Sequence, residues 1–180
     1  SEMFLFMKAA GLRSANTAGL PSYPSKMARM ELDFILYGAG IEITSFVRPD
    51  VLPQRADAAE VLSRVERREG VSFSVLIPNR RGLENAMKQR EKIDEISVFL
   101  SASETHNEKN VNRTIGQSLA ELTGVVADAR QDGLRPVAVI STSFGCPYEG
   151  HVDQQRVFEI GAALTEAGCA EIGFGDTTGM

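Results

Sequence analysis

The sequence contains no tryptophan and only two cysteines among its 180 residues. Two cysteines cannot build the disulfide framework of a small secreted domain, and neither lies in a C-x-x-C pair. No stretch approaches the roughly 18 consecutive apolar residues of a spanning helix, which argues against a membrane protein. Lys and Arg number 19 against 24 Asp and Glu, a formal charge of −5 without a long basic run, which argues against a nucleic-acid surface. The composition is that of one globular domain of ordinary size.

The beginning of the chain differs from the remainder. The first thirty residues contain a single acid, Glu2, and four cations, namely Lys8, Arg13, Lys26 and Arg29. This balance faintly resembles a transit peptide, although the apolar run 3–7 is too short for the core of a secretory signal. We therefore expect an N-terminal segment over 1–24 that is separate from a domain over 25–180. We expect a cytoplasmic location, with the mitochondrial matrix as the alternative.

From residue 25 onward, short apolar runs alternate with longer segments of helical period, a pattern typical of βα units and a parallel sheet. The expected strands are rich in Val, Ile and Phe and lie at 41–46, 71–77, 95–100, 137–142 and 171–175. The expected helices have apolar residues at spacings of three and four and lie at 55–68, 82–92, 108–132 and 153–167, with a further candidate at 25–37.

The spacing of the strands indicates the architecture. Successive strands begin on average about 32 residues apart, close to the roughly 31 expected when about 250 residues make eight βα units. A doubly wound sheet would give a similar spacing, but no G-x-G-x-x-G follows any strand, and polar residues gather at every strand's C-terminal end. The sequence therefore predicts an α/β fold, an incomplete TIM (β/α)8 barrel of five parallel strands alternating with helices.

Polar residues after the strands are the first candidates for a site: Ser45, Asn79, Ser101, Ser103, Ser141, Ser143, Asp176 and Thr177. Loops are commonly polar, so a single Ser carries little weight. Asp176 is more informative, because Gly-Asp-Thr directly follows an apolar strand and places a carboxylate at the mouth of the sheet. Glu42 is the most informative, because it lies inside the expected strand 41–46, on one face with Thr44 and Phe46 by regular alternation.

A buried carboxylate must be hydrogen-bonded, paired with a cation or protonated. For Glu42 we favour a role in acid–base chemistry over a structural pairing with Arg or Lys. The two histidines, His106 and His151, are expected at the surface and are too far apart in sequence to form a short metal-binding pair. No base is placed beside Cys146 by the sequence, so we expect a buried or loop thiol there rather than a nucleophile.

Five segments together closely resemble the hydroxymethylglutaryl-CoA lyases, in the pyruvate carboxyltransferase-like group of TIM barrels. They are IEITSFVRPDVLPQRADAAEVL, SVLIPNRRGLENA, SASETHNEKNVNRTIGQS, STSFGCPYEG and EIGFGDTTGM, and the resemblance runs from about Ile41 to Met180. It implies retro-Claisen cleavage of 3-hydroxy-3-methylglutaryl-CoA to acetyl-CoA and acetoacetate, with Mg²⁺ or Mn²⁺ as Lewis acid.

The resemblance also implies roles for individual residues. Glu42 matches the family's active-site glutamate, and Asp176 matches the aspartate of a Gly-Asp-Thr motif that handles a substrate proton. Ser45, Ser103 and Thr177 match positions near the acyl or CoA moiety of an acyl-CoA substrate. These assignments agree with the choice of Glu42 and Asp176 made from the strands alone.

The chain departs from the family at the metal. The family's first strand ends in Arg-Asp-Gly, whose Asp ligates the metal, but no Asp precedes Asp33 here. The family's H-x-H pair, metal-binding Asn and Gly-rich loop with a catalytic Cys would all follow Met180, and Cys146 matches a different position. We therefore expect this chain alone to be inactive. The alternative is a non-catalytic barrel fragment that binds a CoA-type ligand or a protein partner.

An unclosed barrel leaves two strand edges unpaired, near 41–46 and 171–175. Natural sheets usually cover such edges, because unpaired backbone groups template association with another chain. We therefore expect a homo-oligomer, as a dimer or a swapped assembly, or poor solubility. The alternative is that the first thirty residues supply a substitute strand, for which Met3–Met7 is the candidate.

Overall fold

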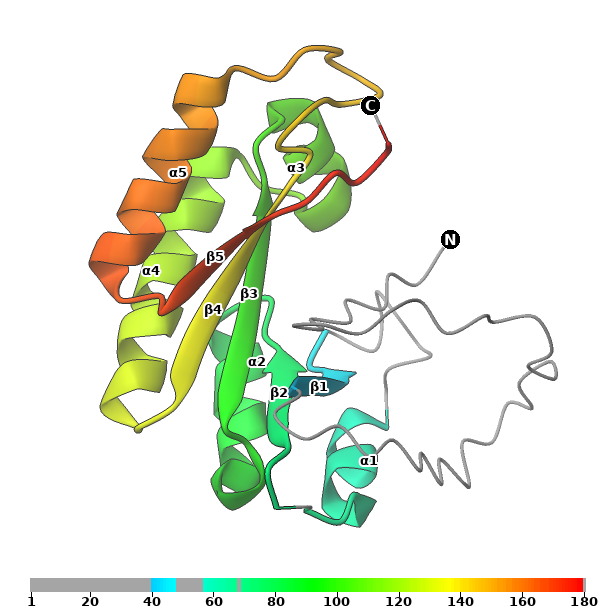
Figure 1. The fold of residues 1–180 in the computed structure, drawn as a ribbon, viewed down its shortest axis with the longest axis vertical. Coiled ribbons are helices and arrows are strands. Elements are labelled where there is room, and N and C mark those ends of the chain that lie inside the picture. Colours follow the sequence, from blue (N-terminus) through cyan, green and yellow to red (C-terminus); the bar gives the residue numbers. More distant parts are fainter. Residues whose placement is uncertain (1–39, 48–56, 68, 180) are drawn as a thin grey trace, which may run out of the picture.

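The computed structural model describes residues 40–47, 57–67 and 69–179 (Figure 1). The expected segment 1–24 and the expected helix at 25–37 lie outside the described residues. The elements are β1 (Gly40–Ser45), α1 (Ala58–Arg64), β2 (Ser72–Leu76), α2 (Arg80–Ala86), the 3-10 helix η2 (Met87–Lys92), β3 (Glu95–Ser101), α3 (Glu104–Val111), α4 (Ile115–Gln131), β4 (Arg135–Ser141), α5 (Gln154–Ala167) and β5 (Glu171–Phe174). Within the described ranges, none of the helices has both the length and the apolar character required to cross a membrane.

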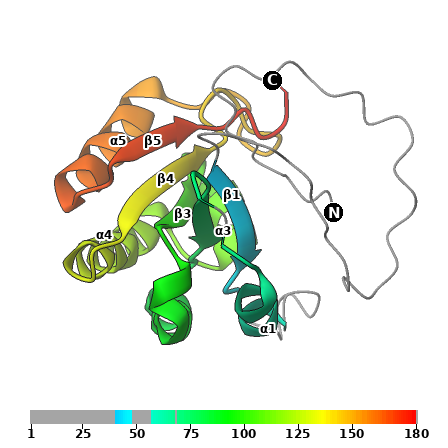
Figure 2. The same ribbon diagram turned by 60° about the horizontal axis from the view of Figure 1, so that its bottom comes forward.

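The five strands form one parallel sheet in the order β1-β2-β3-β4-β5. All five expected strands are confirmed to within two residues at each end. The order of the strands follows the chain without reversal, as in a stretch of a barrel and unlike a doubly wound sheet. Figure 2 shows the curved sheet with α1, α4 and α5 along its outer side. In the described part of the chain, β1 and β5 are the edges of the sheet.

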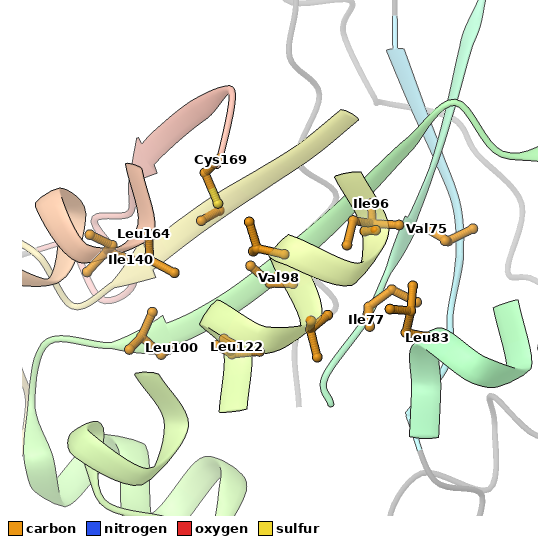
Figure 3. Packing of buried hydrophobic residues seen from close by; sticks show 14 of the residues in the cluster. Val75, Ile77, Leu83, Ile96, Val98, Leu100, Leu122, Ile140, Leu164 and Cys169 are labelled. Carbon is orange, nitrogen blue, oxygen red and sulfur yellow. The ribbon is translucent and has the colours of Figure 1, made fainter. Parts of the chain in front are cut away.

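The two faces of the sheet differ in chemistry. The outer face carries apolar side chains that pack against the helices, and Figure 3 shows this core with Val75, Ile96, Val98, Leu100 and Ile140 from the strands and Leu122 and Leu164 from α4 and α5. The inner face is more polar and lines a hollow of about 290 Å³ with Glu42, Ser74, Glu95, Ser97, Val139, Glu171 and Gly173 among its residues. Because successive side chains alternate between faces, the same strands hold the core and present polar groups to the hollow.

One helix expectation is wrong. The sequence predicts a single helix at 108–132, but the chain forms α3 and α4, with Asn112 between them at φ 55°. A capping box starts α4: the Thr114 hydroxyl accepts the N–H of Gln117 at 3.1 Å, and the Gln117 side chain accepts the N–H of Thr114 at 3.0 Å. The cap at Thr114 therefore starts a separate helix, although the apolar residues continue at helical spacing through 108–132.

The helix expected at 82–92 begins earlier and changes type. The side chain of Asn79 accepts the N–H of Gly82 at 2.9 Å, so α2 begins at Arg80. Its second half is the 3-10 helix η2, in which Gln89 departs from helical geometry with φ −131° and ψ 40°. The helix expected at 153–167 is confirmed as α5, and α1 ends at Arg64, where Val65 turns to an extended conformation.

Candidate active site

Glu42 and Ser45 lie on the same face of β1, contrary to simple alternation. Glu42 pairs with Ser74 and Ser45 pairs with Leu76, and the register shifts between Glu42 and Thr44. This β-bulge adds one residue to β1, so two residues three apart face the same way. Phe46 turns instead into the core between sheet and helices. The expectation that Glu42 shares a face with Thr44 and Phe46 is therefore wrong, because of the bulge.

Ser45 closes β1 at the C-terminal end of the sheet and is 2% exposed. Within the described ranges, its hydroxyl is the one buried side-chain polar atom that lacks a hydrogen-bond partner. Burying an unsatisfied hydroxyl is unfavourable by about 1–3 kcal/mol, and such groups in native proteins call for an explanation. A ligand oxygen at this position would satisfy the hydroxyl.

Three neighbouring segments meet through one residue at the C-terminal ends of β3, β4 and β5. The backbone N–H of Thr142 donates to the hydroxyl of Thr177 at 2.8 Å. The backbone N–H of Ser103 approaches the hydroxyl of Thr142 at 3.3 Å. The structure therefore brings Ser103 and Thr177 together through Thr142. Asp176 is exposed beside Thr177, and its Oδ1 accepts the N–H of Gly179 at 2.9 Å.

The hydroxyl of Ser103 is buried and engaged within the protein. It caps α3 by accepting the N–H of His106 at 3.1 Å, and it accepts the thiol of Cys146 at 3.0 Å. Its remaining hydrogen bond is to Glu149. A hydroxyl has one hydrogen and two acceptor positions, so these three bonds use its whole capacity. Ser103 thus joins the loop after β3 to the loop after β4.

Further contacts link the loop after β3 to the loop after β4. The carboxylate of Glu149 accepts the N–H of Thr105 at 2.7 Å, and Arg156 donates to the carbonyl of Ala102 at 3.3 Å. Burial by itself raises the pKa of Glu149, but the hydrogen bonds from Thr105 and Ser103 and the charge of Arg156 outweigh it and hold the pKa below its ordinary value. Glu149 therefore stays ionised and keeps the loops together at neutral pH.

His106 is half-buried rather than a surface residue, so that expectation is wrong, whereas His151 is exposed as expected. The ring Nδ1 of His106 lies 2.6 Å from the hydroxyl of Ser101, and its ring centre lies 6.2 Å from that of Tyr148. Burial lowers the pKa of His106. The position explains the error, because α3 begins earlier than expected and carries His106 in its first turn.

Both cysteines are buried. Cys146 is confirmed as a buried loop thiol, which donates to Ser103 and accepts the N–H of Tyr148 at 3.4 Å. Burial raises the pKa of Cys169 to about 11, so this thiol is protonated at neutral pH. Neither cysteine has the environment of an activated nucleophile.

Two ion pairs lie at the opposite, N-terminal end of the inner face. Arg135 at the start of β4 bonds to the carboxylates of Glu95 on β3 and Glu171 on β5. The hydrogen bond to Glu171 is the largest influence that raises the pKa of Arg135, and Glu95 adds to it. Two of the acidic residues around the hollow are therefore balanced by a cation at the base of the sheet.

Sequence reasoning missed two buried polar residues that hold this region together. Asn107 accepts the N–H of Ser101 at 3.0 Å and donates to the carbonyl of Arg113 and the hydroxyl of Ser118, both at 2.8 Å. Thr142 is fully buried and forms the link described above. No pattern in the sequence points to Asn107, whereas Thr142 lies between Ser141 and Ser143, two residues that the strand ends did indicate.

The described residues do not form a metal centre. Among residues 40–47, 57–67 and 69–179, no three His, Cys, Asp or Glu side chains are grouped so as to hold a metal ion. These residues therefore do not fit the Mg²⁺ or Mn²⁺ site that the family resemblance implies, and we assign no chemical step to a metal held by them.

Comparison with known proteins gives one consistent result. The HMGL-like family model matches residues 41–180. The hydroxymethylglutaryl-CoA lyase YngG of Bacillus subtilis is 47% identical over 139 residues, which cover 77% of this chain and 46% of that protein. A crystal structure of the B. subtilis HMG-CoA lyase aligns with a TM-score of 0.75 and 46% identity, over 79% of this chain and 48% of that one.

A structure of an HMG-CoA lyase from Acinetobacter baumannii in complex with coenzyme A and 3-methylmalate aligns with a TM-score of 0.72 and 35% identity, over 78% of this chain and 45% of that one. The chain thus spans about half the length of the relatives it matches. The match covers all five strands of the sheet and supports its interpretation as part of a TIM barrel. The chain belongs to the HMG-CoA lyase (HMGL-like) family.

Proposed function

We propose that this chain supplies part of the active site of a hydroxymethylglutaryl-CoA lyase, a carbon–carbon lyase that acts on an acyl-CoA. One observation carries the proposal. The family match runs through Glu42, Ser45, Ser103, Asp176 and Thr177, and each of these lies on the inner face or at the C-terminal end of a strand. In barrels of this kind, the C-terminal ends of the strands carry the chemistry. The relative bound to coenzyme A supports an acyl-CoA as the ligand.

The reaction is a retro-Claisen cleavage of 3-hydroxy-3-methylglutaryl-CoA. A base takes the proton of the C3 hydroxyl, the C2–C3 bond breaks, and its electron pair moves to C2 and the thioester as an enolate. C3 becomes the ketone of acetoacetate, and protonation of C2 gives acetyl-CoA. The chemistry therefore needs proton transfer at two points, for which carboxylates are suited.

We assign proton transfer to Asp176 and place Glu42 as the second carboxylate of the site. The bond from Gly179 to Oδ1 fixes the direction of the Asp176 side chain. The hydroxyls of Ser45 and Thr177 are proposed to bind oxygens of the acyl group. The hydrogen bonds of the Ser103 hydroxyl all go to other groups of the protein. We therefore propose that Ser103 contributes to the site by holding the loop after β3 in place.

We further propose that the 180-residue chain alone does not complete this reaction, because it matches none of the metal ligands of the family pattern. The purified chain is assayed for acetoacetate with Mg²⁺ or Mn²⁺ and titrated calorimetrically with each cation. No acetoacetate and no tight cation binding are expected. Substantial turnover by the chain would contradict this part of the proposal.

A chimaera tests whether the residues are competent for catalysis. The matched segment of the B. subtilis lyase is replaced by residues 41–180 of this chain, which restores a full-length barrel. The chimaera should form acetoacetate, and Asp176→Asn and Glu42→Gln should each lower its kcat by about 100-fold or more. Glu166→Gln, at an exposed position on α5, is the matched control and should not change kcat.

A folded chimaera that binds coenzyme A but makes no acetoacetate would favour the alternative, a non-catalytic fragment that binds a CoA-type ligand or a protein partner. Retention of activity by Asp176→Asn and Glu42→Gln would overturn the residue assignments and leave the family membership intact.

We propose a homo-oligomer for the isolated chain, since β1 and β5 are edges of the described sheet. Sedimentation velocity checks this, and a cooperatively melting monomer would contradict it. We also propose a cytoplasmic location, with the mitochondrial matrix as the alternative, to be decided by fractionation of the native host.

A further inference from the structure

Thr142 adopts an unusual backbone conformation directly after β4. Its φ of 54° lies in the left-handed region, which β-branched residues rarely enter. The residue is fully buried. Such a conformation is unfavourable by about 1–3 kcal/mol and persists where the surrounding contacts determine it, often near functional sites.

The contacts of Thr142 explain why the conformation is held. Its N–H donates to the Thr177 hydroxyl at 2.8 Å, while its own hydroxyl donates to the carbonyl of Ser141 at 2.7 Å and accepts the N–H of Ser103 at 3.3 Å. The next residue adds a second link between the segments that follow β4 and β5, because the N–H of Ser143 donates to the carbonyl of Gly175 at 3.1 Å. Main-chain and side-chain groups of Thr142 thus engage two different segments.

The bond to Thr177 restricts what its hydroxyl can do. A threonine hydroxyl has one hydrogen to donate and two positions that accept. Because the N–H of Thr142 occupies one accepting position, the O–H hydrogen of Thr177 is directed away from Thr142. Thr177 is partly exposed at the end of the sheet, so an oxygen of a ligand there can accept this hydrogen.

We propose that Thr142 is a positioning residue, which orients the hydroxyl of Thr177 as a hydrogen-bond donor toward an oxygen of the bound acyl-CoA. The inference rests on the proposed function, in which Thr177 contacts the acyl group. It adds a residue that touches no ligand itself and acts through Thr177.

The orientation is tested first without ligand, by NMR on the full 180-residue chain. Three-bond couplings report whether the χ1 angle of Thr177 is fixed or averaged. We expect one rotamer in the unmodified protein and in Thr142→Ser, which keeps the hydroxyl, and averaging in Thr142→Ala. Thr165→Ala, at an exposed position on α5, is the matched control and should match the unmodified protein.

Thr142→Gly guards against failure of the alanine variant to fold, because glycine enters the left-handed region without strain. It lacks the anchoring hydroxyl, so averaging at Thr177 is expected there too. A single Thr177 rotamer in both Thr142→Ala and Thr142→Gly would overturn the proposal, and so would averaging in the unmodified chain.

Ligand binding is measured next, by calorimetric titration with 3-hydroxy-3-methylglutaryl-CoA. Thr142→Ala and Thr177→Val should each weaken binding about three- to tenfold, the range of one hydrogen bond, and the double variant should bind no more weakly than Thr177→Val. Thr142→Ser should restore most of the affinity. Additive losses in the double variant would show that Thr142 does not act through Thr177, and would overturn the proposal. If only the chimaera with the B. subtilis lyase binds this ligand, the variants are compared in the chimaera. If neither the unmodified chain nor the chimaera binds it, the proposed function fails, while the rotamer measurement still decides whether Thr142 orients Thr177.

Discussion

Glu42 and Ser45 face the same side of β1 because a β-bulge separates them, so two residues three apart in sequence share the inner face. The same bulge sends Phe46 into the core on the helix side of the sheet, where it is 9% exposed. Without the bulge, Ser45 would face the core and Phe46 would lie on the inner face of the sheet. The bulge therefore determines the faces of both a proposed site residue, Ser45, and a core residue, Phe46, and bulges are common beside active sites.

Phe46→Ala is expected to lower the free energy of unfolding by about 3–5 kcal/mol, because it removes a large buried side chain and leaves a cavity. Phe158→Ala is the matched control. Phe158 is 63% exposed on α5, so its truncation should change stability by less than about 0.5 kcal/mol. Urea unfolding followed by far-ultraviolet circular dichroism measures both. Equal effects of the two substitutions would place Phe46 outside the core and contradict the bulged register.

The strands show how much of the fold can be predicted from the sequence. Their positions and parallel order follow from short runs of Val, Ile and Phe at a regular spacing, because strands buried by helices need such residues. The bulge in β1 leaves no mark in the residues 41–46, since its extra residue is set by pairing with β2. The sequence therefore places Glu42 in a strand correctly, but Glu42 is half-buried rather than buried, and Thr44 and Phe46 are assigned to the wrong face.

In the candidate site, too, some residues are indicated by local sequence patterns and others only by the structure. Ser45, Asp176 and Thr177 are proposed for the site because they lie at the ends of strands and match the family motifs. Thr142 and Asn107 are not indicated by such patterns, because their importance lies in bonds between segments that are far apart in sequence. Such bonds depend on how α3 and the loop after β4 fold over the ends of the strands, which no local pattern specifies.

Asn107→Ala should be among the most destabilising substitutions in the chain. The Asn107 side chain is buried and makes three hydrogen bonds, to Ser101, Arg113 and Ser118. Its removal leaves the buried N–H of Ser101, the buried hydroxyl of Ser118 and the partly buried carbonyl of Arg113 without this partner, and we expect a loss of about 2–4 kcal/mol in the free energy of unfolding. Asn110→Ala, at an exposed position on α3, should change stability by less than about 0.5 kcal/mol. Chemical denaturation compares them, and similar losses would show that the network is not important for stability.

Thr114→Ala tests the break between α3 and α4. The substitution removes the hydroxyl that caps α4 by accepting the N–H of Gln117, and an N-cap of this kind contributes about 1 kcal/mol. Thr114→Ser keeps the cap and should restore most of the stability. The pair of residues Thr114 and Gln117 fits the capping-box pattern, so this helix start was readable from the sequence. An unchanged melting temperature in Thr114→Ala would indicate that packing, rather than the cap, ends α3.

The stability of the chain should depend on pH through His106. Burial lowers the pKa of His106 in the folded state, so the unfolded chain binds a proton more readily. The stabilising contribution is therefore complete above the ordinary histidine pKa of about 6.5 and is lost as the pH falls through the lowered folded-state pKa. Glu149 acts in a lower range, because its pKa is lowered from an ordinary value of 4.5 and its contribution is lost only as the pH falls through the lowered pKa.

Unfolding is measured with urea at about pH 7.5 and about pH 5.5, an interval that spans the ordinary histidine pKa and stays above that of Glu149. His106→Asn removes the titrating ring and should reduce the loss of stability between the two pH values. His151→Asn, at an exposed position, is the matched control and should leave the loss as it is in the unmodified protein. The explanation fails if His106→Asn retains the full pH dependence, because the proton taken up at low pH would then bind elsewhere in the chain. The position of His106 makes the result informative for the site, since protonation there acts on Ser101 at the end of β3, within 2.6 Å of the ring.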